Sequence, residues 1–328
     1  MAAPWILIPN QNGMRWLPAC LGSLAATLPP EVTVCVIDNG SQDGSCEFLR
    51  REFPQVKLLE LELNLGFVQA TNLGILAAKR ANAEAALLLN NDTRVSGDWY
   101  ARLKATADAN PDYGILSPWQ NDFEGNASPR TKAIVGDVAR ETAPEVVATD
   151  WVEGSCFWIK RAVLEQVGYL DPLFAPAYFE EMDFCRRAGR AGFKVGVATR
   201  SVIEHHGAGT SMAGEARSRQ RVLCERNYLL YHAAGAVGGF APALRTLVGK
   251  TLRHGLKKWR AGELSLAEWA KAMTGIPGRW QGIRAKAARD GRNWPCTILG
   301  DQSPSTPEHR YYARTAARLE AGGLPALA

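Results

Sequence analysis

Short apolar segments alternate with amphipathic segments through the first ninety residues of the chain, and each apolar segment ends in polar residues. The clearest case is residues 87–93, Leu-Leu-Leu-Asn-Asn-Asp-Thr, where a run of leucines gives way to two amides and a carboxylate. A short, continuous apolar run predicts a strand that is covered on both faces. In open α/β sheets, ligands bind where such strands end. The pattern therefore constrains both the fold and the place of a binding site.

Strands are predicted at residues 5–8, 32–37, 56–59 and 85–89, with helices at 14–27, after residue 43 and from 67 to about 80. Strands that alternate with helices of this length form right-handed βαβ units. No G-x-G-x-x-G turn follows the first strand and no Walker lysine is present, which argues against dinucleotide enzymes and P-loop NTPases. We expect an α/β fold with a Rossmann-like, mixed but mostly parallel sheet, helices on both faces and a helical C-terminal extension.

The composition of the 328-residue chain, with 46% hydrophobic and 22% charged residues, is typical of a soluble globular protein. This length suffices for one large α/β domain with an appendage, or for two domains. Seven dispersed cysteines without a C-x-x-C pair argue against a disulfide framework or a zinc site and favour a reducing cytoplasm. The N-terminus lacks the basic and apolar regions of a signal peptide, so secretion is not expected.

Amide and carboxylate side chains recur after the predicted strands, among them Asn10, Asp38, Asn64 and Asp92. Each one alone is well explained by a turn, since Asn and Asp favour turns. Their repetition at consecutive strand ends instead favours a site for a base, a ribose and a metal-bound diphosphate. Asp92, flanked by amides and a hydroxyl, offers hard oxygen ligands for Mg²⁺ or Mn²⁺.

Several segments resemble, in the right order, the successive motifs of family 2 glycosyltransferases, and the resemblance covers roughly residues 5–230. The segments are residues 8–13, 36–45, 64–67 with Asn72, and 89–93. The rhamnosyltransferase-like and galactofuranosyltransferase-like branch is the most similar. The resemblance implies a GT-A fold and a nucleotide-sugar donor. The donor-binding residues that it implies are Pro9, Asn10, Asn12, Asp38, Asn39, Asn64, Gly66, Asn72, Asn90, Asn91 and Gly154.

The same resemblance places residues 90–92, Asn-Asn-Asp, at the D-x-D metal motif of the family. Because the first position is Asn, Asp92 would supply most of the negative charge that binds a divalent ion. His205 and His206, in a glycine-rich loop after a strand predicted near 193–197, provide the histidine that the family places on the metal or the diphosphate. An exposed histidine pair with no ligand is the alternative, and the sequence does not choose between the two side chains.

Residues 118–150 break the regular pattern and predict a surface excursion. Residues 151–159, Trp-Val-Glu-Gly-Ser-Cys-Phe-Trp-Ile, then predict a strand interrupted at Gly154, where backbone can approach a ligand. An ordinary kink in the strand is the alternative. By the resemblance, this glycine lies beside the donor sugar.

Residues 178–189 place Glu180, Glu181 and Asp183 in the first turn of a predicted helix, among aromatic residues. Acidic residues are common in a first turn because they favour the positive end of the helix dipole. Mutual repulsion and apolar neighbours raise the pKa of a carboxylate toward that of a useful general base. The stretch resembles the E-D-x-D motif of the family, which implies Glu181 as the base and Asp183 as a residue that fixes the acceptor. Since Glu replaces the Asp of the family there, Glu180 remains the alternative base.

The C-terminal part is basic: residues 245–292 carry a net charge of +9, against about −4 for the rest. Apolar side chains between residues 244 and 260 fall at steps of three and four among lysines and arginines, which is typical of a basic amphipathic helix. Such a helix binds an anionic membrane surface or a partner, or packs on the catalytic domain with a solvated basic face. Residues 229–244 are uncharged but too short to cross a bilayer.

We therefore divide the chain into a catalytic domain at 1–225, a basic helical region at 226–292 and a loosely packed tail at 293–328. The catalytic domain would contain a nucleotide-sugar half at about 1–117 and an acceptor half at about 118–225. The resemblance implies an inverting transferase that uses Mg²⁺ or Mn²⁺. Its donor would be a dTDP- or UDP-sugar, and the transferred group would be a rhamnose-like or other hexose. The acceptor would be a glycan or a lipid-linked saccharide in cell-surface polysaccharide synthesis, and no nucleic-acid partner is expected.

The expected location is the cytoplasm, at the inner face of the cytoplasmic membrane, since an anionic leaflet suits the basic region. Two other functions compete with this one. A sugar-phosphate nucleotidylyltransferase shares the topology but needs a glycine-rich, basic loop where residues 10–13 read Asn-Gln-Asn-Gly. A degenerate transferase that only binds sugar nucleotides or a membrane-associated partner is the second, since Asn90 and Glu181 depart from the motifs of the family.

Overall fold

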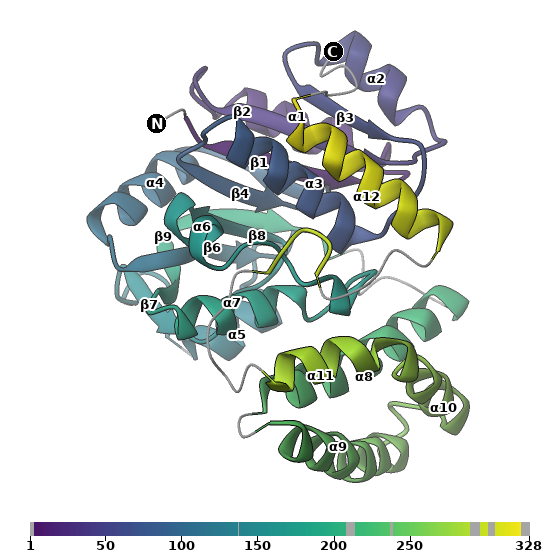
Figure 1. The fold of residues 1–328 in the computed structure, drawn as a ribbon. Coiled ribbons are helices and arrows are strands. Elements are labelled where there is room, and N and C mark those ends of the chain that lie inside the picture. The colour runs from purple at the N-terminus through teal and green to yellow at the C-terminus, as the bar shows by residue number, and fades with distance from the viewer. Residues whose placement is uncertain are drawn as a thin grey trace.

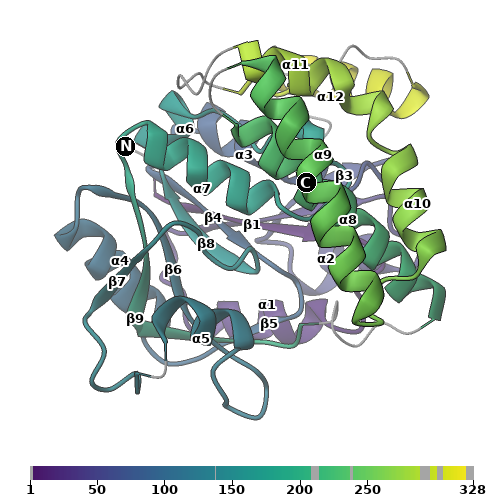
Figure 2. The ribbon, with the colours of Figure 1, turned by 90° about the horizontal axis from the view of Figure 1, so that it is seen from below.

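The computed structural model describes residues 3–136, 138–207, 214–236, 239–288, 296–300 and 306–322. Within these residues the strands form one nine-stranded sheet with helices on both faces. A separate group of helices lies below the sheet in Figure 1 and toward the viewer in Figure 2. The expected α/β architecture with a helical C-terminal extension is confirmed.

The first half of the sheet is parallel, in the order β3-β2-β1-β4. Its strands are β1 (Trp5–Asn10), β2 (Thr33–Asn39), β3 (Lys57–Leu61) and β4 (Ala85–Leu89). The helices between them are α1 (Leu17–Ala25), α2 (Ser45–Glu52) and α3 (Phe67–Arg80). All were expected from the sequence, because buried parallel strands produce continuous apolar runs, and the short length of these runs favours strands over helices.

The second half is mixed and continues the order as β8-β6-β9-β5, with β7 pairing to β9. These strands are β5 (Thr93–Val95), β6 (Tyr113–Asn121), β7 (Val146–Thr149), β8 (Cys156–Lys160) and β9 (Lys194–His205). β8 runs antiparallel to β4, whereas β6 and β9 are parallel to each other. The direction of the sheet therefore reverses beside β4, the strand that leads to Asp92.

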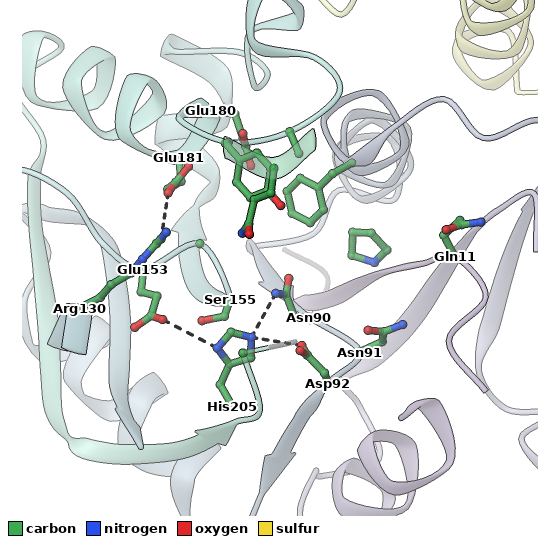
Figure 3. Close-up of a pocket in the computed structure, with 17 residues that line it drawn as sticks. Gln11, Asn90, Asn91, Asp92, Arg130, Glu153, Ser155, Glu180, Glu181 and His205 are labelled. Carbon is green, nitrogen blue, oxygen red and sulfur yellow. Dashed lines mark hydrogen bonds and ion pairs between the residues drawn. The ribbon is translucent and has the colours of Figure 1, made fainter. Parts of the chain in front are cut away.

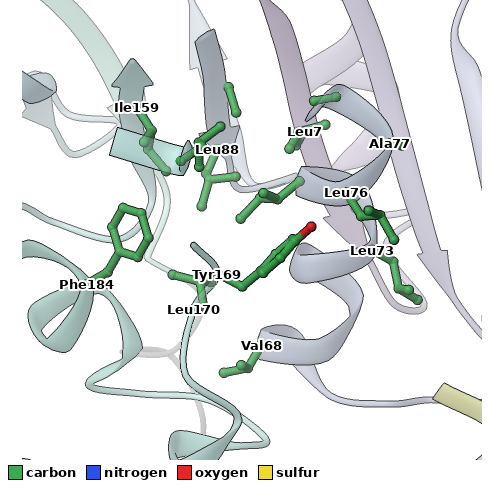
Figure 4. Packing of buried hydrophobic residues seen from close by; sticks show 14 of the residues in the cluster. Leu7, Val68, Leu73, Leu76, Ala77, Leu88, Ile159, Tyr169, Leu170 and Phe184 are labelled. Carbon is green, nitrogen blue, oxygen red and sulfur yellow. The ribbon is translucent and has the colours of Figure 1, made fainter. Parts of the chain in front are cut away.

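Alternate side chains of each buried strand pack into two different apolar clusters. Leu7 and Leu88 face α3 together with Tyr169 (Figure 4). Ile6 and Leu87 face the opposite side, which α1 and α4 (Trp99–Ala109) cover. Because helices cover both faces, every position of β4 is buried, and each such leucine contributes about 2 kcal/mol of hydrophobic stabilisation.

Three elements differ from the sequence-based predictions. The expected excursion at 118–150 contains the end of β6, helix α5 (Pro129–Val135) and β7. Helix α5 forms there because Ser128 caps it and Pro129 starts it. The strand predicted from residue 151 begins only at Cys156. Strand β9 continues to His205 instead of ending near residue 197. His205 is thus the last residue of the strand, and His206 directly follows it.

The helices that follow β8 support the site and the C-terminal region. They are α6 (Arg161–Gln166), η1 (Pro172–Phe174), α7 (Glu180–Arg190), α8 (Gly214–Gly235), α9 (Phe240–Arg260), α10 (Leu266–Thr274), η3 (Pro277–Arg279) and α11 (Trp280–Ala288). Helix α8 starts before residue 226, where the helical region was expected, and packs with η1, α9 and α11 in one apolar cluster. Among the described residues, no helix has the length and hydropathy needed to cross a membrane.

The prediction of a loosely packed tail is wrong for helix α12 (Pro307–Glu320), which lies against α3 on the sheet (Figure 1). Its Tyr312, Ala316 and Leu319 are buried in the same cluster as Leu88. These residues fall at steps of four and three within a largely polar sequence, so one narrow apolar face suffices for packing. Residues 293–295, 301–305 and 323–328 of the predicted tail lie outside the described residues.

Candidate active site

A cavity of about 440 Å³ opens where β1 and β4 end, beside the reversal of strand direction. It is bounded by the loops after these strands, the segment before β8, the start of α7 and one residue of α8, Gln220. The predicted site residues that line it are Pro9, Asn90, Asn91, Asp92, Gly154, Glu180, Glu181 and His205 (Figure 3). Segments distant in the sequence are thus brought together in one polar site.

Several predicted donor-binding amides lie behind the cavity wall and hold one another. Asn10 donates through Nδ2 to Asp38 Oδ2 at 2.9 Å and accepts at Oδ1 from Asn91 Nδ2 at 2.7 Å. Asp38 also accepts from the Ser41 backbone at 2.9 Å, and Asn12 Oδ1 accepts from the Gln42 backbone at 2.8 Å. These hydrogen bonds fix the loops that follow β1 and β2. Of the bonded residues, Asn91 is the one that lines the cavity.

A second group of predicted residues also orders loops. Asn39 Nδ2 donates to Asn64 Oδ1 at 3.0 Å, and Asn64 Oδ1 also accepts from the Gly66 backbone at 2.9 Å. Gly66 has φ +82°, and a Cβ there would lie 2.6 Å from Pro176, so this close approach requires glycine. Asn72 is fully buried and exchanges two hydrogen bonds with the Leu170 backbone, at 2.8 and 3.0 Å. None of these four residues, which were predicted to bind the donor, lines the cavity.

Asp92 and His205 form one wall of the cavity. His205 Nε2 lies 3.2 Å from Asp92 Oδ1, and its Nδ1 lies 3.8 Å from Glu153 Oε1. Burial disfavours the imidazolium, but the two carboxylates outweigh burial and raise the pKa of His205 to about 9. Asn90 Nδ2 contacts the same imidazole at 3.4 Å (Figure 3).

The structure separates the two histidines, which the sequence leaves equivalent. The His206 ring packs against Trp16 with centroids 4.1 Å apart, and against Phe123 at 5.3 Å. Only its backbone N–H reaches Asp92, donating to the main-chain oxygen at 3.0 Å. Of the pair, His205 is therefore the histidine whose side chain meets the Asp92 carboxylate, whereas residues 208–213 of the predicted loop lie outside the described residues.

The donor set fits a divalent ion that protein and ligand hold jointly. One carboxylate and one imidazole come within contact distance, with the Asn90 amide beside them. Within the described residues, no group of three His, Cys, Asp or Glu side chains is arranged to hold a metal by itself. The remaining ligands would be oxygen atoms of a bound diphosphate together with water, which is how Mg²⁺ usually binds beside phosphates.

Two residues with positive φ place the acidic pair opposite this wall. Tyr178 has φ +79° and Phe179 has φ +71°, directly before α7 starts at Glu180. Strained backbone of this kind persists only where its surroundings hold it. Asn227 of α8 does so, because its Nδ2 donates to the backbone oxygens of residues 174, 177 and 178 at 2.7, 2.9 and 2.8 Å.

Glu180 and Glu181 are both buried but have different neighbours. Burial first, then the Glu181 charge, raises the pKa of Glu180 well above its usual range. Burial also raises the pKa of Glu181, while the Arg130 guanidinium, 3.5 Å from Glu181 Oε1, opposes the rise. Gly154 lies directly beside Glu181, since a Cβ at residue 154 would be in ordinary van der Waals contact with Glu181 Cγ, 3.4 Å away.

Asp183 does not reach the cavity, in contrast to the expectation that it fixes the acceptor. It accepts from Arg186 Nη2 at 2.6 Å and from Arg187 Nε at 2.8 Å, and lies 3.3 Å from Lys286 Nζ. Burial alone would raise its pKa, but the three cations outweigh burial and hold the pKa well below its usual range. Asp183 lies three residues after Glu180 on α7. Its carboxylate is buried among these cations and anchors the helix.

Two charged residues of the site were not predicted from the sequence. Arg130 lies on α5, inside the stretch expected to be an irregular excursion. Glu153 precedes Gly154 and accepts from Ser128 Oγ at 2.8 Å while facing His205. A carboxylate next to a glycine in an otherwise apolar segment was a visible signal for Glu153, whereas no local pattern marks Arg130.

The fold is of the GT-A type, since solved structures of GT-A glycosyltransferases share the architecture. A Mannosyltransferase PcManGT from Pyrobaculum calidifontis in complex with GDP-Man and Mn²⁺ aligns with TM-score 0.54 and 16% identity, covering 97% of this chain and 86% of that one. S. aureus TarS 1-349 in complex with UDP aligns with TM-score 0.54 and 14% identity, covering 98% and 92%. At such identities the likeness establishes the fold.

The family follows from sequence: residues 5–168 match Glycosyl transferase family 2, and the chain belongs to that family. An N-acetylglucosaminyl-diphospho-decaprenol L-rhamnosyltransferase from Mycobacterium tuberculosis is 26% identical over an alignment of 216 residues, and the match covers 56% of this chain and 70% of the relative. The low-salt glycan biosynthesis hexosyltransferase Agl10 of Haloferax volcanii is 29% identical over an alignment of 171 residues, and the match covers 49% of this chain and 54% of that relative. The resemblance seen in the motifs is thus confirmed.

Proposed function

We propose that the protein transfers a hexosyl group, with inversion, from a nucleoside diphosphate sugar to a hydroxyl group of a saccharide acceptor. The observation that carries the proposal is one cavity with the Asp92–His205 pair on one wall and the Glu180–Glu181 pair on another (Figure 3). The first pair suits a diphosphate leaving group. The second supplies a carboxylate whose raised pKa suits a general base.

In this mechanism Glu181 accepts the proton of the acceptor hydroxyl as its oxygen attacks the anomeric carbon. The bond from that carbon to the diphosphate oxygen breaks on the opposite side, so a single displacement inverts the configuration. The nucleoside diphosphate leaves toward the wall of the cavity that Asp92 and His205 form.

A divalent cation, Mg²⁺ or Mn²⁺, belongs to the proposed donor site. Asp92 and His205 would hold it, and when bound it would neutralise charge on the diphosphate. Support comes from the pairing of carboxylate and imidazole, and from structural neighbours described with Mn²⁺. Since the protein supplies few ligands, metal binding should depend on the nucleotide.

The proposed donor is a dTDP- or UDP-sugar, and the proposed acceptor is a glycan or a saccharide linked to a lipid diphosphate. The name of the mycobacterial relative includes both a rhamnosyl group and such a lipid, and another neighbour was solved with UDP-GlcNAc. We place the reaction in the reducing cytoplasm, at the inner face of the membrane, in cell-surface polysaccharide synthesis. All seven cysteines are free, in keeping with a reducing compartment.

Calorimetric titration with UDP, dTDP and GDP, with and without Mn²⁺, tests the donor site. We expect one nucleotide to bind tightly only with metal, and Asp92→Asn to abolish the metal effect while the protein stays folded. Arg51→Ala, an exposed change on α2, is the matched control. Failure of every nucleotide to bind under any metal condition would contradict the proposal.

A non-catalytic sugar-nucleotide-binding protein is distinguished by turnover. If the protein only bound sugar nucleotides, wild type and Glu181→Gln would bind the nucleotide equally well, and neither would transfer or hydrolyse the sugar. We expect instead that wild type releases nucleoside diphosphate from its donor in the presence of acceptor, and that Glu181→Gln binds the nucleotide but does not.

A further inference from the structure

Exposed apolar side chains are concentrated on helix α9. Among the described residues, the large apolar side chains that are exposed lie between residues 240 and 266, apart from Leu63 and Val138. Those on one side of α9 are 40–59% exposed, and they are Leu244, Val248, Leu252, Leu256 and Trp259. Steps of four and three keep them within a stripe of about 120° around the helix. We call this set the α9 apolar stripe.

A strip of basic residues runs beside the α9 apolar stripe. Each of Arg245, Arg253, Lys257 and Arg260 directly follows a stripe residue in sequence and is therefore displaced by about 100° around the helix. Gly249 occupies the remaining position of this strip, and a Cβ there would meet open space. The missing side chain leaves a hollow between the basic residues.

That hollow is part of a cavity of about 410 Å³, which we call the basic cavity. Its cationic lining is Arg245, Lys250, Arg253 and Lys257, and Tyr228 of α8 forms another part of the wall. Lys250 Nζ donates to the Tyr228 hydroxyl at 3.2 Å. Within the described part of the chain, no carboxylate forms an ion pair with any of these four cations, and the nearby Glu225 pairs with Lys258.

The opposite side of α9 packs on the protein and fixes how the exposed side is presented. Ala243 and Leu247 are buried against α8 and α11. The His254 ring stacks on Tyr228, with centroids 3.9 Å apart and an interplanar angle of 20°. Helix α9 is thus held firmly on its inner side, and it is the outermost helix of the C-terminal group (Figure 1).

We propose that α9 docks the protein on an anionic membrane surface, with the α9 apolar stripe entering the interface and the basic cavity receiving a lipid phosphate. An apolar stripe alone would fit many partners. The adjoining cluster of unneutralised cations selects a partner that is apolar and negatively charged over the same area, which is the chemistry of an acidic phospholipid leaflet. An α9 without a single acidic residue is consistent with this choice.

The docked face is coupled to the active site through α8. Gln220 of that helix lines the active-site cavity and Tyr228 lines the basic cavity. Eight residues separate them, which corresponds to about 12 Å along the helix. Docking through α9 would therefore hold the active site close to the lipid headgroups, where a lipid-linked substrate would be presented.

Flotation of the full chain with phospholipid vesicles tests this inference and needs no turnover, so it is independent of the proposed function. We expect wild type to bind vesicles of mixed phosphatidylcholine and phosphatidylglycerol, and high salt to weaken the binding. Val248→Glu with Leu252→Glu removes the apolar contact. Arg253→Glu with Lys257→Glu removes the charge match and should lower the affinity for anionic vesicles about tenfold or more.

Val138→Glu and Arg51→Glu are matched controls, because both positions are exposed and lie outside α9. Thermal unfolding of each variant confirms that it is folded. Equal binding of wild type and both α9 variants would overturn the inference, as would no binding to anionic vesicles or equal binding to pure phosphatidylcholine. A wild-type dimer in solution that Leu252→Glu dissociates, without vesicle binding, would assign the face to self-association and likewise overturn it.

Discussion

Glu180 and Glu181 are adjacent in the chain, yet their surroundings suit them to different protonation states. Glu180 is packed without an ion pair among the described residues, and burial together with the Glu181 charge keeps it protonated to a higher pH. Glu181 has Arg130 3.5 Å away, which favours its ionised form. A general base must be ionised to accept a proton, so the geometry favours Glu181 for this role and leaves Glu180 as a neutral hydrogen-bond donor.

We expect Glu181→Gln to lower kcat by about 10²–10⁴-fold, the usual contribution of a general base, with little change in nucleotide Kd. Glu180→Gln should lower kcat much less, because a protonated glutamic acid and a glutamine both donate a hydrogen bond. Steady-state kinetics and calorimetry on the two variants provide the comparison. A larger loss in Glu180→Gln would assign the base to Glu180 instead.

The pH dependence of kcat follows from the same pair. Glu181 works when deprotonated, so activity is lost as the pH falls through its raised pKa, above the value of about 4.3 for an ordinary glutamate. Because Arg130 opposes the rise, Arg130→Gln should move this acidic limb to a higher pH. Lys132→Gln on the same helix is the control. An acidic limb that stays in place or moves to lower pH in Arg130→Gln would contradict the assignment.

At the scale of elements, the turn before α7 decides whether the acidic pair faces the cavity. The sequence does not reveal this turn, because Tyr178 and Phe179 are not residues that favour positive φ. Its support comes from Asn227, about fifty positions later in the chain, whose amide donates to three backbone oxygens of the preceding segment. The C-terminal helices therefore help to build the site.

Asn227→Ala removes a buried donor from these oxygens, and we expect it to lower the free energy of unfolding by about 1–3 kcal/mol. It should also lower kcat while leaving nucleotide Kd unchanged, since the donor side of the cavity rests on β1 and β4. Arg219→Ala, an exposed change on α8, is the control. Loss of stability with an unchanged kcat would show that the turn holds its shape without this clamp.

Local patterns made the parallel half of the fold predictable, because Leu87 to Leu89 and the other strands are buried on both faces. They also predicted Asp92 and the acidic pair. Sequence spacing could not tell His205 from His206, since only the pairing of β9 with β5 decides which ring meets Asp92. Nor could it show that Asp183 pairs with Lys286, which comes from α11, a hundred residues further on.

At the scale of the whole molecule, the site extends beyond the part of the chain that matches the family. Residues 5–168 supply Asp92, Arg130 and Glu153, whereas Glu181 and His205 lie after that segment. Helix α12 also lies beyond the family match, and it contributes to stability because it covers part of the apolar face of the sheet next to α3. Residues beyond the family match thus complete both the candidate site and the cover of the sheet.

Leu319 of α12 is buried against the core, whereas Arg314 on the same helix is exposed. Leu319→Ala should lower the free energy of unfolding by about 2–4 kcal/mol through lost burial and a residual cavity, and Arg314→Ala should change it little. Chemical denaturation gives both values. Equal, small effects would mean that α12 contributes little to folding. Because α12 packs on α3, behind the strands that end at Asp92, nucleotide binding measured well below the unfolding transition should be the same in both variants.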